Sequence, residues 1–324
     1  MPGWKELLEE THAHGNGHGS PFDAVRRKYL RRYAQLTRRN VIAYYSGWLQ
    51  KPELEQLGFA FELTDADKHA FLSVTHRMDR RKGLDLFLHT PGGDLAATES
   101  LVDYLRKTFG TDVRAIIPQI AMSAGTMLAL SCKDVLMGRH STIGPIDPHL
   151  GPDVTSHAVL EEFETARQQM KAEPDTIPLW QAILSKYRPT LVTEGMKAHQ
   201  WARTLVHGWL VSGMFAGRPD ADEAATKVVS FLAEHALALS HRRHISAERA
   251  KGIGISVTLL DEPGREKLQD AVLSVHHAYV QTLSFTGALK IVENQQGVAV
   301  VSAVRGPVAP QRVPPADPPA NAAA

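Results

Sequence analysis

The feature that most constrains the fold is a regular alternation of β-prone and helical segments between residues 40 and 137. Apolar runs rich in Val, Ile, Leu and Tyr predict four strands, at residues 40–45, 83–89, 113–118 and 134–137. Helical spacing of apolar residues predicts helices between them, at residues 64–77, 95–109 and 122–131. Strands that alternate with helices build a parallel sheet, so we expect an α/β fold whose ligand site lies at the carboxyl ends of the strands.

The segments on either side of this alternation differ from it in composition. Residues 1–38 are polar and charged and predict a leading arm that contains an amphipathic helix over residues 22–36. Beyond residue 160 the pattern is helical, and it predicts a helical C-terminal region with one short β-prone piece at residues 255–260. Residues 306–324 are rich in Pro and Ala and cannot pack a core, so we expect a disordered tail.

Composition excludes several classes of partner and site. The 36 basic and 35 acidic side chains nearly cancel, which gives no indication of a nucleic-acid partner. A single cysteine, Cys132, excludes an intrachain disulfide, and its apolar neighbours predict a buried, inert thiol. No secretory signal is evident at the amino terminus, so we expect a cytoplasmic location. The uncharged stretch 115–132 contains Pro118 and Gln119, which favours a buried strand, turn and helix over an integral membrane segment.

Two adjacent glycines, Gly92 and Gly93, stand where a predicted strand gives way to a helix. Glycines allow positive φ angles and let backbone N–H groups approach a ligand closely, so this pair is a candidate source of oxyanion donors. A phosphate loop would end in Gly-Lys-Ser or Gly-Lys-Thr, whereas here Asp94 follows and would repel phosphate. A plain turn that uses glycine for its geometry remains an alternative.

The next predicted strand ends in the sequence IAMSAGTMLAL, in which Ser123 is flanked by small residues. A serine at a sharp turn from strand to helix exposes its Oγ beside backbone N–H groups, here that of Ala124, and this geometry suits a nucleophile. An ordinary helix N-cap is the alternative role for Ser123.

The order PGGD, then SAG about thirty residues later, then STIGPIDP resembles the serine peptidases of the Clp-protease/crotonase superfamily. The sequence is most similar to the serine dehydrogenase proteinase family, relatives of signal peptide peptidase A, from about residue 40 to residue 297. The resemblance implies a Clp/crotonase-like parallel sheet with surrounding helices, and a peptidase domain over residues 39–305. It also implies that Ser123 forms an acyl-enzyme with a peptide or protein substrate, and that the N–H groups of Gly93 and Ala124 bind the oxyanion.

The general base is the part of the expected site that the resemblance defines least. Signal-peptide-peptidase-like enzymes use a lysine shortly before a Thr-Glu helix start, and Lys186 fits because it lies seven residues before Thr193. Clp-type peptidases use a histidine about twenty-five residues after the serine, and His149 lies 26 residues on. Lys171 is a further rival. We favour a Ser-Lys dyad with Lys186, whose apolar neighbours, among them Ile183, would lower the pKa of its amine by desolvation.

Two alternatives to a peptidase remain at this stage: a catalytically silent scaffold or adaptor of the same fold, and a crotonase relative that handles acyl-CoA. No cofactor or metal site is expected, since His241 and His244 have no acidic partner at matching spacing. Relatives of this fold form oligomers, and the helical region offers more apolar positions than a small core needs, which predicts a homo-oligomer. These positions are Leu205, Val206, Trp209, Leu210, Val228, Val229 and Leu232.

Overall fold

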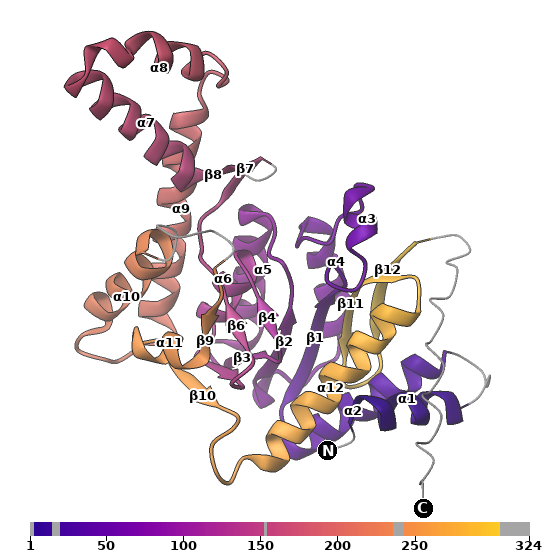
Figure 1. The fold of residues 1–324 in the computed structure, drawn as a ribbon. Coiled ribbons are helices and arrows are strands. Elements are labelled where there is room, and N and C mark those ends of the chain that lie inside the picture. The colour runs from indigo at the N-terminus through magenta and orange to yellow at the C-terminus, as the bar shows by residue number, and fades with distance from the viewer. Residues whose placement is uncertain (1–2, 15–19, 152–153, 236–242, 305–324) are drawn as a thin grey trace, which may run out of the picture.

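A mixed β-sheet forms the centre of the molecule, as the computed structural model in Figure 1 shows for residues 3–14, 20–151, 154–235 and 243–304. Within these residues the sheet has seven strands in the order β10-β5-β3-β2-β1-β11-β12. The strands from β10 to β1 run parallel, whereas β11 pairs antiparallel with β1, and β12 antiparallel with β11. The bounds are β1 Asn40–Ser46, β2 Leu84–His89, β3 Val113–Ile117, β5 Asp134–Met137, β10 Val257–Leu259, β11 Ala288–Asn294 and β12 Ala299–Ala303.

The α/β fold predicted from the sequence is confirmed, and the four strands predicted between residues 40 and 137 are all present. The predicted helix over residues 95–109 has the same bounds in the structure, α5 Leu95–Phe109. The predicted sheet was parallel throughout, and the antiparallel strands β11 and β12 make it mixed instead. The long helix α12, Glu266–Phe285, which precedes β11, was also not foreseen.

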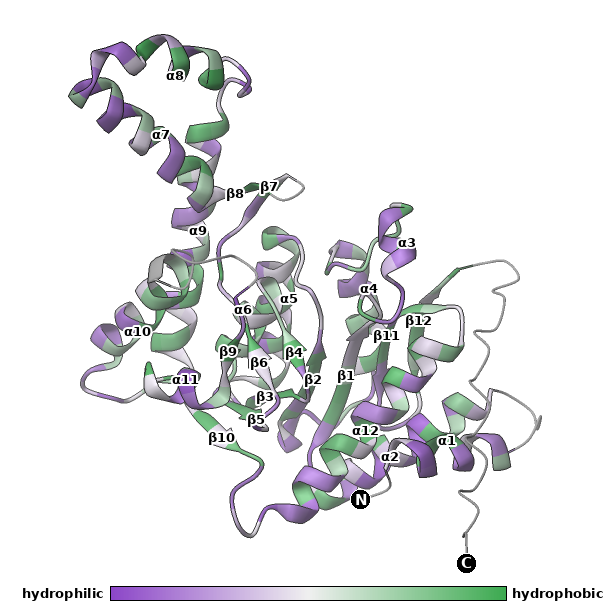
Figure 2. Cartoon of the chain, in the orientation of Figure 1, coloured by the Kyte–Doolittle hydropathy of each residue, from purple (hydrophilic) through white to green (hydrophobic). Residues whose placement is uncertain are grey.

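Helices cover both faces of the sheet, because the strand residues alternate between two apolar cores. In β1, Val41 and Tyr45 face one core and Ile42 and Tyr44 face the other. The first core is closed by α1 Trp4–Ala13, α2 Pro21–Thr37 and α12. The second is closed by α4 Asp65–Thr75, α5, α6 Ala124–Leu130, α9 Leu191–Ser212, α10 Ala221–Ser230 and α11 Ala247–Gly252. Figure 2 shows hydrophobic residues concentrated along the central strands.

The amino-terminal segment, predicted as a leading arm, packs on the body of the molecule. Helix α2 confirms the predicted amphipathic helix, and Tyr29, Leu30 and Tyr33 on it are buried against the sheet. Leu7 of α1 is fully buried in the same core. Arg26 of α2 forms a buried ion pair with Glu293 of β11, with 2.9 Å between Nε and Oε2. The predicted tail, residues 306–324, lies outside the described residues.

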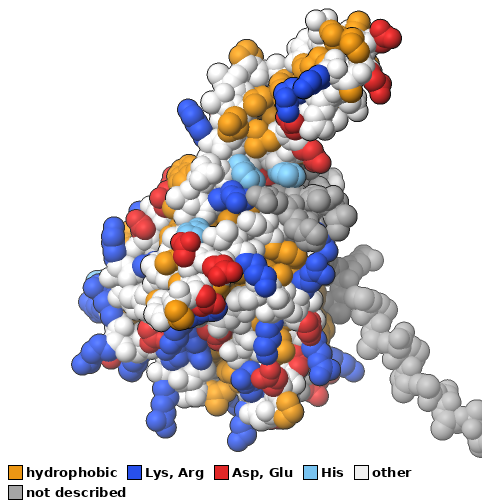
Figure 3. All heavy atoms as spheres, turned by 90° about the vertical axis from the view of Figure 1, so that its left-hand side faces the viewer, with side chains coloured by type: hydrophobic (Ala, Val, Ile, Leu, Met, Phe, Trp, Pro, Cys, Tyr) orange, Lys and Arg blue, Asp and Glu red, His pale blue; other side chains and the backbone are white. Residues whose placement is uncertain are grey.

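A helical arm projects from one end of the body (Figure 1), and it consists of α7 Ser156–Ala172, α8 Ile177–Leu184 and the first turns of α9. A hairpin of β7 His149–Gly151 and β8 Val154–Thr155 lies at its base. Helix α8 is rich in apolar residues, yet none of its residues is buried. Figure 3 shows hydrophobic side chains gathered on this arm. The exposed apolar residues of the arm are Ile177, Leu179, Met196 and Trp201.

The apolar positions that suggested a homo-oligomer are used within the chain. Val206, Trp209, Leu210, Val228, Val229 and Leu232 are buried in the second core, and Leu205 packs against it. The number of apolar residues that this core takes up was underestimated, because α9 and α10 cover one face of a wide sheet. The positions named in the sequence therefore leave no surplus apolar surface that would indicate an oligomer.

Three smaller features complete the fold. A short sheet joins β4 Ile120–Ala121, β6 Thr142–Ile143 and β9 Ile245–Ser246. Cys132 is buried, as predicted, and burial raises the pKa of its thiol to about 12. Among the helices that the structure describes, none combines the length and the apolar character that a membrane span needs.

Candidate active site

The glycine pair forms a turn that is tied to a neighbouring segment through its backbone. Leu63 N–H donates to Gly92 O at 2.7 Å, and Asp94 N–H donates to Leu63 O at 2.9 Å. Gly92 has a φ of 115°. A Cβ on Gly93 would lie 2.3 Å from both the N and the O of Leu63, which is closer than real Cβ contacts allow. Only glycine fits at position 93 without opening this bridge.

Asp94, the residue after the pair, has a structural role. Its Oδ1 accepts a hydrogen bond from Ala97 N–H at 2.7 Å, so its side chain caps the amino terminus of α5. A carboxylate in this position is incompatible with phosphate binding at the turn, as the sequence indicated.

Ser123 lies between β4 and α6 in a backbone conformation that few residues other than glycine adopt. Its φ is 49° and its ψ is −116°, and its side chain makes no capping hydrogen bond to α6. The alternative role as a helix N-cap is therefore not supported. Strain of this kind costs about 1–3 kcal/mol and is found most often at functional sites, including the turns that present nucleophilic serines.

The two turns predicted from the sequence pack directly against each other. A Cβ on Gly92 would lie 2.7 Å from Ser123 Cβ and 3.1 Å from Ala124 N. Met122 N–H donates to Thr90 O at 3.0 Å and links the segments that lead into the two turns. Among the described residues, neither Gly93 N–H nor Ala124 N–H donates a hydrogen bond. The structure thus packs Gly92, the residue before Gly93, against Ser123 and the backbone N of Ala124.

The IGPIDP segment lies beside the Ser123 turn. A Cβ on Gly144 would lie 2.5 Å from Met122 Cε, so this segment is in close contact with the residue before Ser123. Gly144 N–H also donates to Thr126 Oγ1 at 3.0 Å, which fixes the segment on α6.

A carboxylate–histidine pair at the base of the arm was not predicted from the sequence. Asp147 is buried, and its Oδ1 lies 3.5 Å from Nδ1 of His199 on α9. Burial by itself would raise the pKa of Asp147, but hydrogen bonds from His199, Ser156 and the backbone of His157 outweigh it and lower the pKa. A carboxylate beside Nδ1 can orient an imidazole, as it does in catalytic triads. Asp147 belongs to the IGPIDP motif, but no local signal marked His199.

The three predicted bases are exposed, and they lie on the helical arm and on the hairpin at its base. Lys186 is exposed and lies between α8 and α9 in the projecting arm (Figure 1). Lys171 is exposed near the end of α7, and His149 is exposed on β7. Ser123 Oγ makes no hydrogen bond to any described residue. The apolar wall expected around Lys186 is incomplete, because Ile183 is only half-buried.

A lysine with the perturbed pKa that a base requires is Lys51, in the loop after β1. Burial lowers the pKa of its amine to about 8. Its Nζ donates a hydrogen bond to the carbonyl of Leu283, near the end of α12, which holds the amine against that helix. His89, the last residue of β2, is fully buried, and neither of its ring nitrogens has a hydrogen-bond partner among the described residues. Its ring centroid lies 4.7 Å from that of Trp48, in the loop that also holds Lys51.

The histidines considered for metal binding remain unassigned. His244 is exposed, whereas His241 lies outside the described residues. Within the part of the chain that the structure describes, no three His, Cys, Asp or Glu side chains are grouped as a metal ion requires.

Solved structures and curated proteins show limited likeness to this chain. Two mutants of the 1510-N membrane-bound stomatin-specific protease, one of them in complex with a substrate peptide, match with 14% identity and a TM-score of 0.38. Each match covers 64% of this chain, and 79% and 75% of the respective solved chains.

Two uncharacterized proteins of Methanocaldococcus jannaschii share part of the sequence. MJ0137 is 35% identical over 89 residues, 28% of this chain and 31% of that protein. MJ1495 is 29% identical over 111 residues, 34% of this chain and 37% of that protein. The matched region spans about a third of the length of each relative.

One family matches a larger share of the chain. The ClpP-like SDH-type serine proteinases match over residues 23–186, just over half of the sequence. This range contains the glycine turn, the Ser123 turn and the IGPIDP segment. The chain therefore belongs to the family of ClpP-like SDH-type serine proteinases.

Proposed function

We propose that the protein is a serine endopeptidase in which Ser123 is the nucleophile. Its Oγ attacks the carbonyl carbon of a peptide bond, and the proton passes to a general base. The N–H groups of Gly93 and Ala124 bind the oxyanion of the tetrahedral intermediate. The amine leaves with that proton, and water hydrolyses the acyl-enzyme. The observation that carries this proposal is the strained Ser123 turn packed on Gly92, the residue before the proposed donor Gly93.

We propose Lys186 as the base, and the position of the arm sets a condition on this role. Because Lys186 lies on the projecting arm, it reaches Ser123 only if the arm moves or if the arm of a second copy supplies it. The exposed apolar residues of α8 favour a second copy, since burying them in a homo-oligomer removes apolar surface from water. The Asp147–His199 pair is the rival base that the structure adds.

A mixing experiment separates these arrangements. The Ser123→Ala chain lacks the nucleophile and the Lys186→Ala chain lacks the proposed base, so each alone is expected to be inactive on a fluorogenic peptide. If the arm acts between copies, mixed oligomers of the two variants regain part of the wild-type kcat. Full activity of Lys186→Ala together with loss of activity in His199→Ala would replace the lysine by the histidine.

The proposal as a whole is tested against its two alternatives with the same protein. A peptidase hydrolyses a peptide library in a manner that depends on Ser123. A crotonase relative would bind acyl-CoA thioesters and use the two N–H groups without the serine hydroxyl. A silent scaffold would do neither, and would bind peptides without cleaving them.

A further inference from the structure

A basic groove lies at the opposite end of the sheet from Ser123. It has a volume of about 550 Å³ and forms where the amino ends of β1 and β2 meet the end of α2. This volume is in the range of small-molecule sites. Five cationic side chains line the groove against one carboxylate, and they are Arg31, Arg38, Arg39, Arg77 and Lys82 against Asp79.

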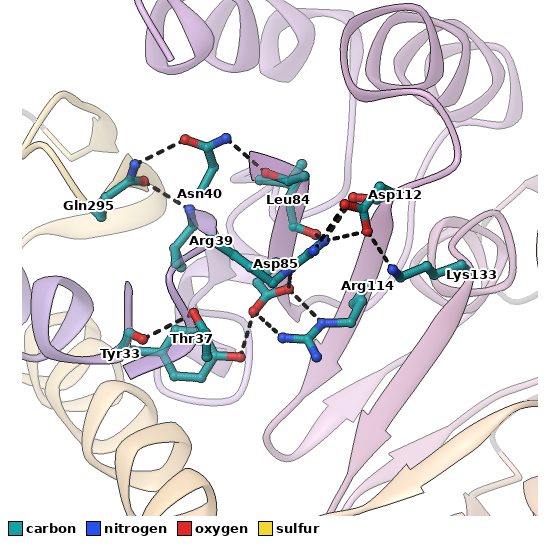
Figure 4. Close-up of polar contacts among 12 residues, drawn as sticks. Tyr33, Thr37, Arg39, Asn40, Leu84, Asp85, Asp112, Arg114, Lys133 and Gln295 are labelled. Carbon is teal, nitrogen blue, oxygen red and sulfur yellow. Dashed lines mark hydrogen bonds and ion pairs between the residues drawn. The ribbon is translucent and has the colours of Figure 1, made fainter. Parts of the chain in front are cut away.

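Arg39, which lines the groove, belongs to an ion cluster that Figure 4 shows. Arg39 Nε donates to Asp85 at 2.6 Å and its Nη1 donates to Asp112 at 3.0 Å. Arg114 binds the same Asp85 through two nitrogens, at 2.8 and 2.6 Å, and Lys133 lies 2.5 Å from Asp112. Three cations thus share two carboxylates in this cluster, so the carboxylates that bind Arg39 are also engaged by Arg114 and Lys133.

The cations of the rim are unpaired. Within the described residues, no ion pair or hydrogen bond engages the side chains of Arg31, Arg38, Arg77 or Lys82, and all four are exposed. The carboxylate of Asp79 is bound by Arg81, outside the groove, at 3.1 Å; Arg81 and, more weakly, the nearby charge of Lys82 lower the pKa of Asp79.

The ends of two helices account for part of this arrangement. Arg38 follows α2 and Arg77 lies two residues beyond α4, and a cation near a helix carboxyl end gains about 0.3–1 kcal/mol. This effect explains why Arg38 and Arg77 each lie near the carboxyl end of a helix. It does not explain why Arg31 and Lys82 face the same concave space, where four unpaired cations repel one another unless an anion joins them.

We propose that this groove binds a compact anion that carries two or more phosphate groups. Guanidinium groups bind phosphate oxygens in pairs, and several of them around one space match a polyanion better than a single charge. Among the described residues that line the groove there is no aromatic ring, so they offer phosphate contacts without a surface on which nucleobases stack. The site is separate from the proposed peptidase chemistry and is independent of it.

Calorimetric titration of the full chain with sodium tripolyphosphate tests the proposal at about 150 mM salt, where the Debye length is about 8 Å. The groove variant combines Arg31→Gln with Arg77→Gln. The control variant combines Lys197→Gln with Lys227→Gln, which removes the same charge from exposed positions on α9 and α10. We expect affinity to fall tenfold or more in the groove variant, about 1.4 kcal/mol, and less than twofold in the control.

Two outcomes overturn the proposal: no binding of tripolyphosphate by the wild type, or an equal loss of affinity in both variants, which would indicate unspecific attraction. Thermal unfolding without ligand checks that the groove variant is folded.

Flotation with phosphatidylcholine vesicles that contain phosphatidylinositol bisphosphate identifies the source of the phosphate groups. Vesicle binding that tripolyphosphate displaces supports a lipid headgroup, and tripolyphosphate binding without vesicle binding supports an anion free in solution. Binding of duplex DNA with no affinity for tripolyphosphate would also contradict the proposal.

Discussion

Replacing Gly93 by Ala tests the role of the glycine turn, and the structure sets the size of the effect. The new Cβ would lie 2.3 Å from two backbone atoms of Leu63, so the bridge between the segments has to open. That loses the hydrogen bonds from Leu63 N–H to Gly92 O and from Asp94 N–H to Leu63 O. At about 0.5–1.5 kcal/mol each, the loss of stability is about 1–3 kcal/mol. This is less than the total stability of most domains, so the variant is expected to fold.

The same displacement moves the N–H of residue 93 away from the oxyanion. We expect kcat to fall by about 10²–10³ with a smaller change in KM, as for the loss of one oxyanion donor. The matched control is Gly217→Ala, since Gly217 also has a positive φ, 80°, but a Cβ there meets nothing within 4 Å. Urea unfolding measures stability and hydrolysis of a peptide measures kcat. A folded Gly93→Ala variant with normal kcat would refute the oxyanion role and leave Gly93 a structural turn residue.

Three further predictions concern the base, pH and assembly. Lys186→Ala should reduce kcat/KM as severely as loss of the serine, while variants of the rivals His149 and Lys171 retain most activity; collapse of the His149 variant alone would point to a Ser-His arrangement. Hydrogen bonds from Arg39 lower the pKa of Asp112 to about 2, below its value in the unfolded chain. This group therefore stabilises the fold above about pH 4, and its contribution is lost as the pH falls through 2. Asp112→Asn should flatten the decline of stability against urea between about pH 5 and pH 2, and an unchanged decline would disprove this prediction. Light scattering at micromolar concentration should give an oligomer, and a strictly monomeric mass would contradict the supply of Lys186 by the arm of a second copy.

The local parts of the fold were predictable, because the signal for each lies within a few turns of chain. The helix over residues 95–109 and the strand over residues 134–137 have the predicted bounds, since apolar periodicity and flanking glycine or aspartate define both. The antiparallel return of β11 was not predictable in this way. It depends on pairs such as Tyr45 with Ile291, which are far apart in the sequence.

The candidate site shows the same difference between local signals and contacts of residues that are distant in the sequence. Ser123 and Gly93 were found because each stands at a turn from strand to helix with small residues around it, and the structure packs the two turns together. Lys186 was selected because the resemblance implies a lysine shortly before the Thr193-Glu194 pair, and its apolar neighbours supported the choice. Those neighbours lie on an arm where α8 buries no residue. Asp147 and His199 come from different elements, and only the folded chain brings them within 3.5 Å.

Covalent labelling with a fluorophosphonate tests the central claim most directly, because the reagent reacts only with an activated serine. After incubation of the folded full chain, peptide mass spectrometry should find one adduct, on Ser123. The adduct should be absent from Ser123→Ala and much reduced in Gly93→Ala, in which the donor for the phosphonyl oxygen is displaced. Absence of labelling in the folded wild-type protein, or labelling at a different serine, would contradict the assignment of Ser123 as a peptidase nucleophile.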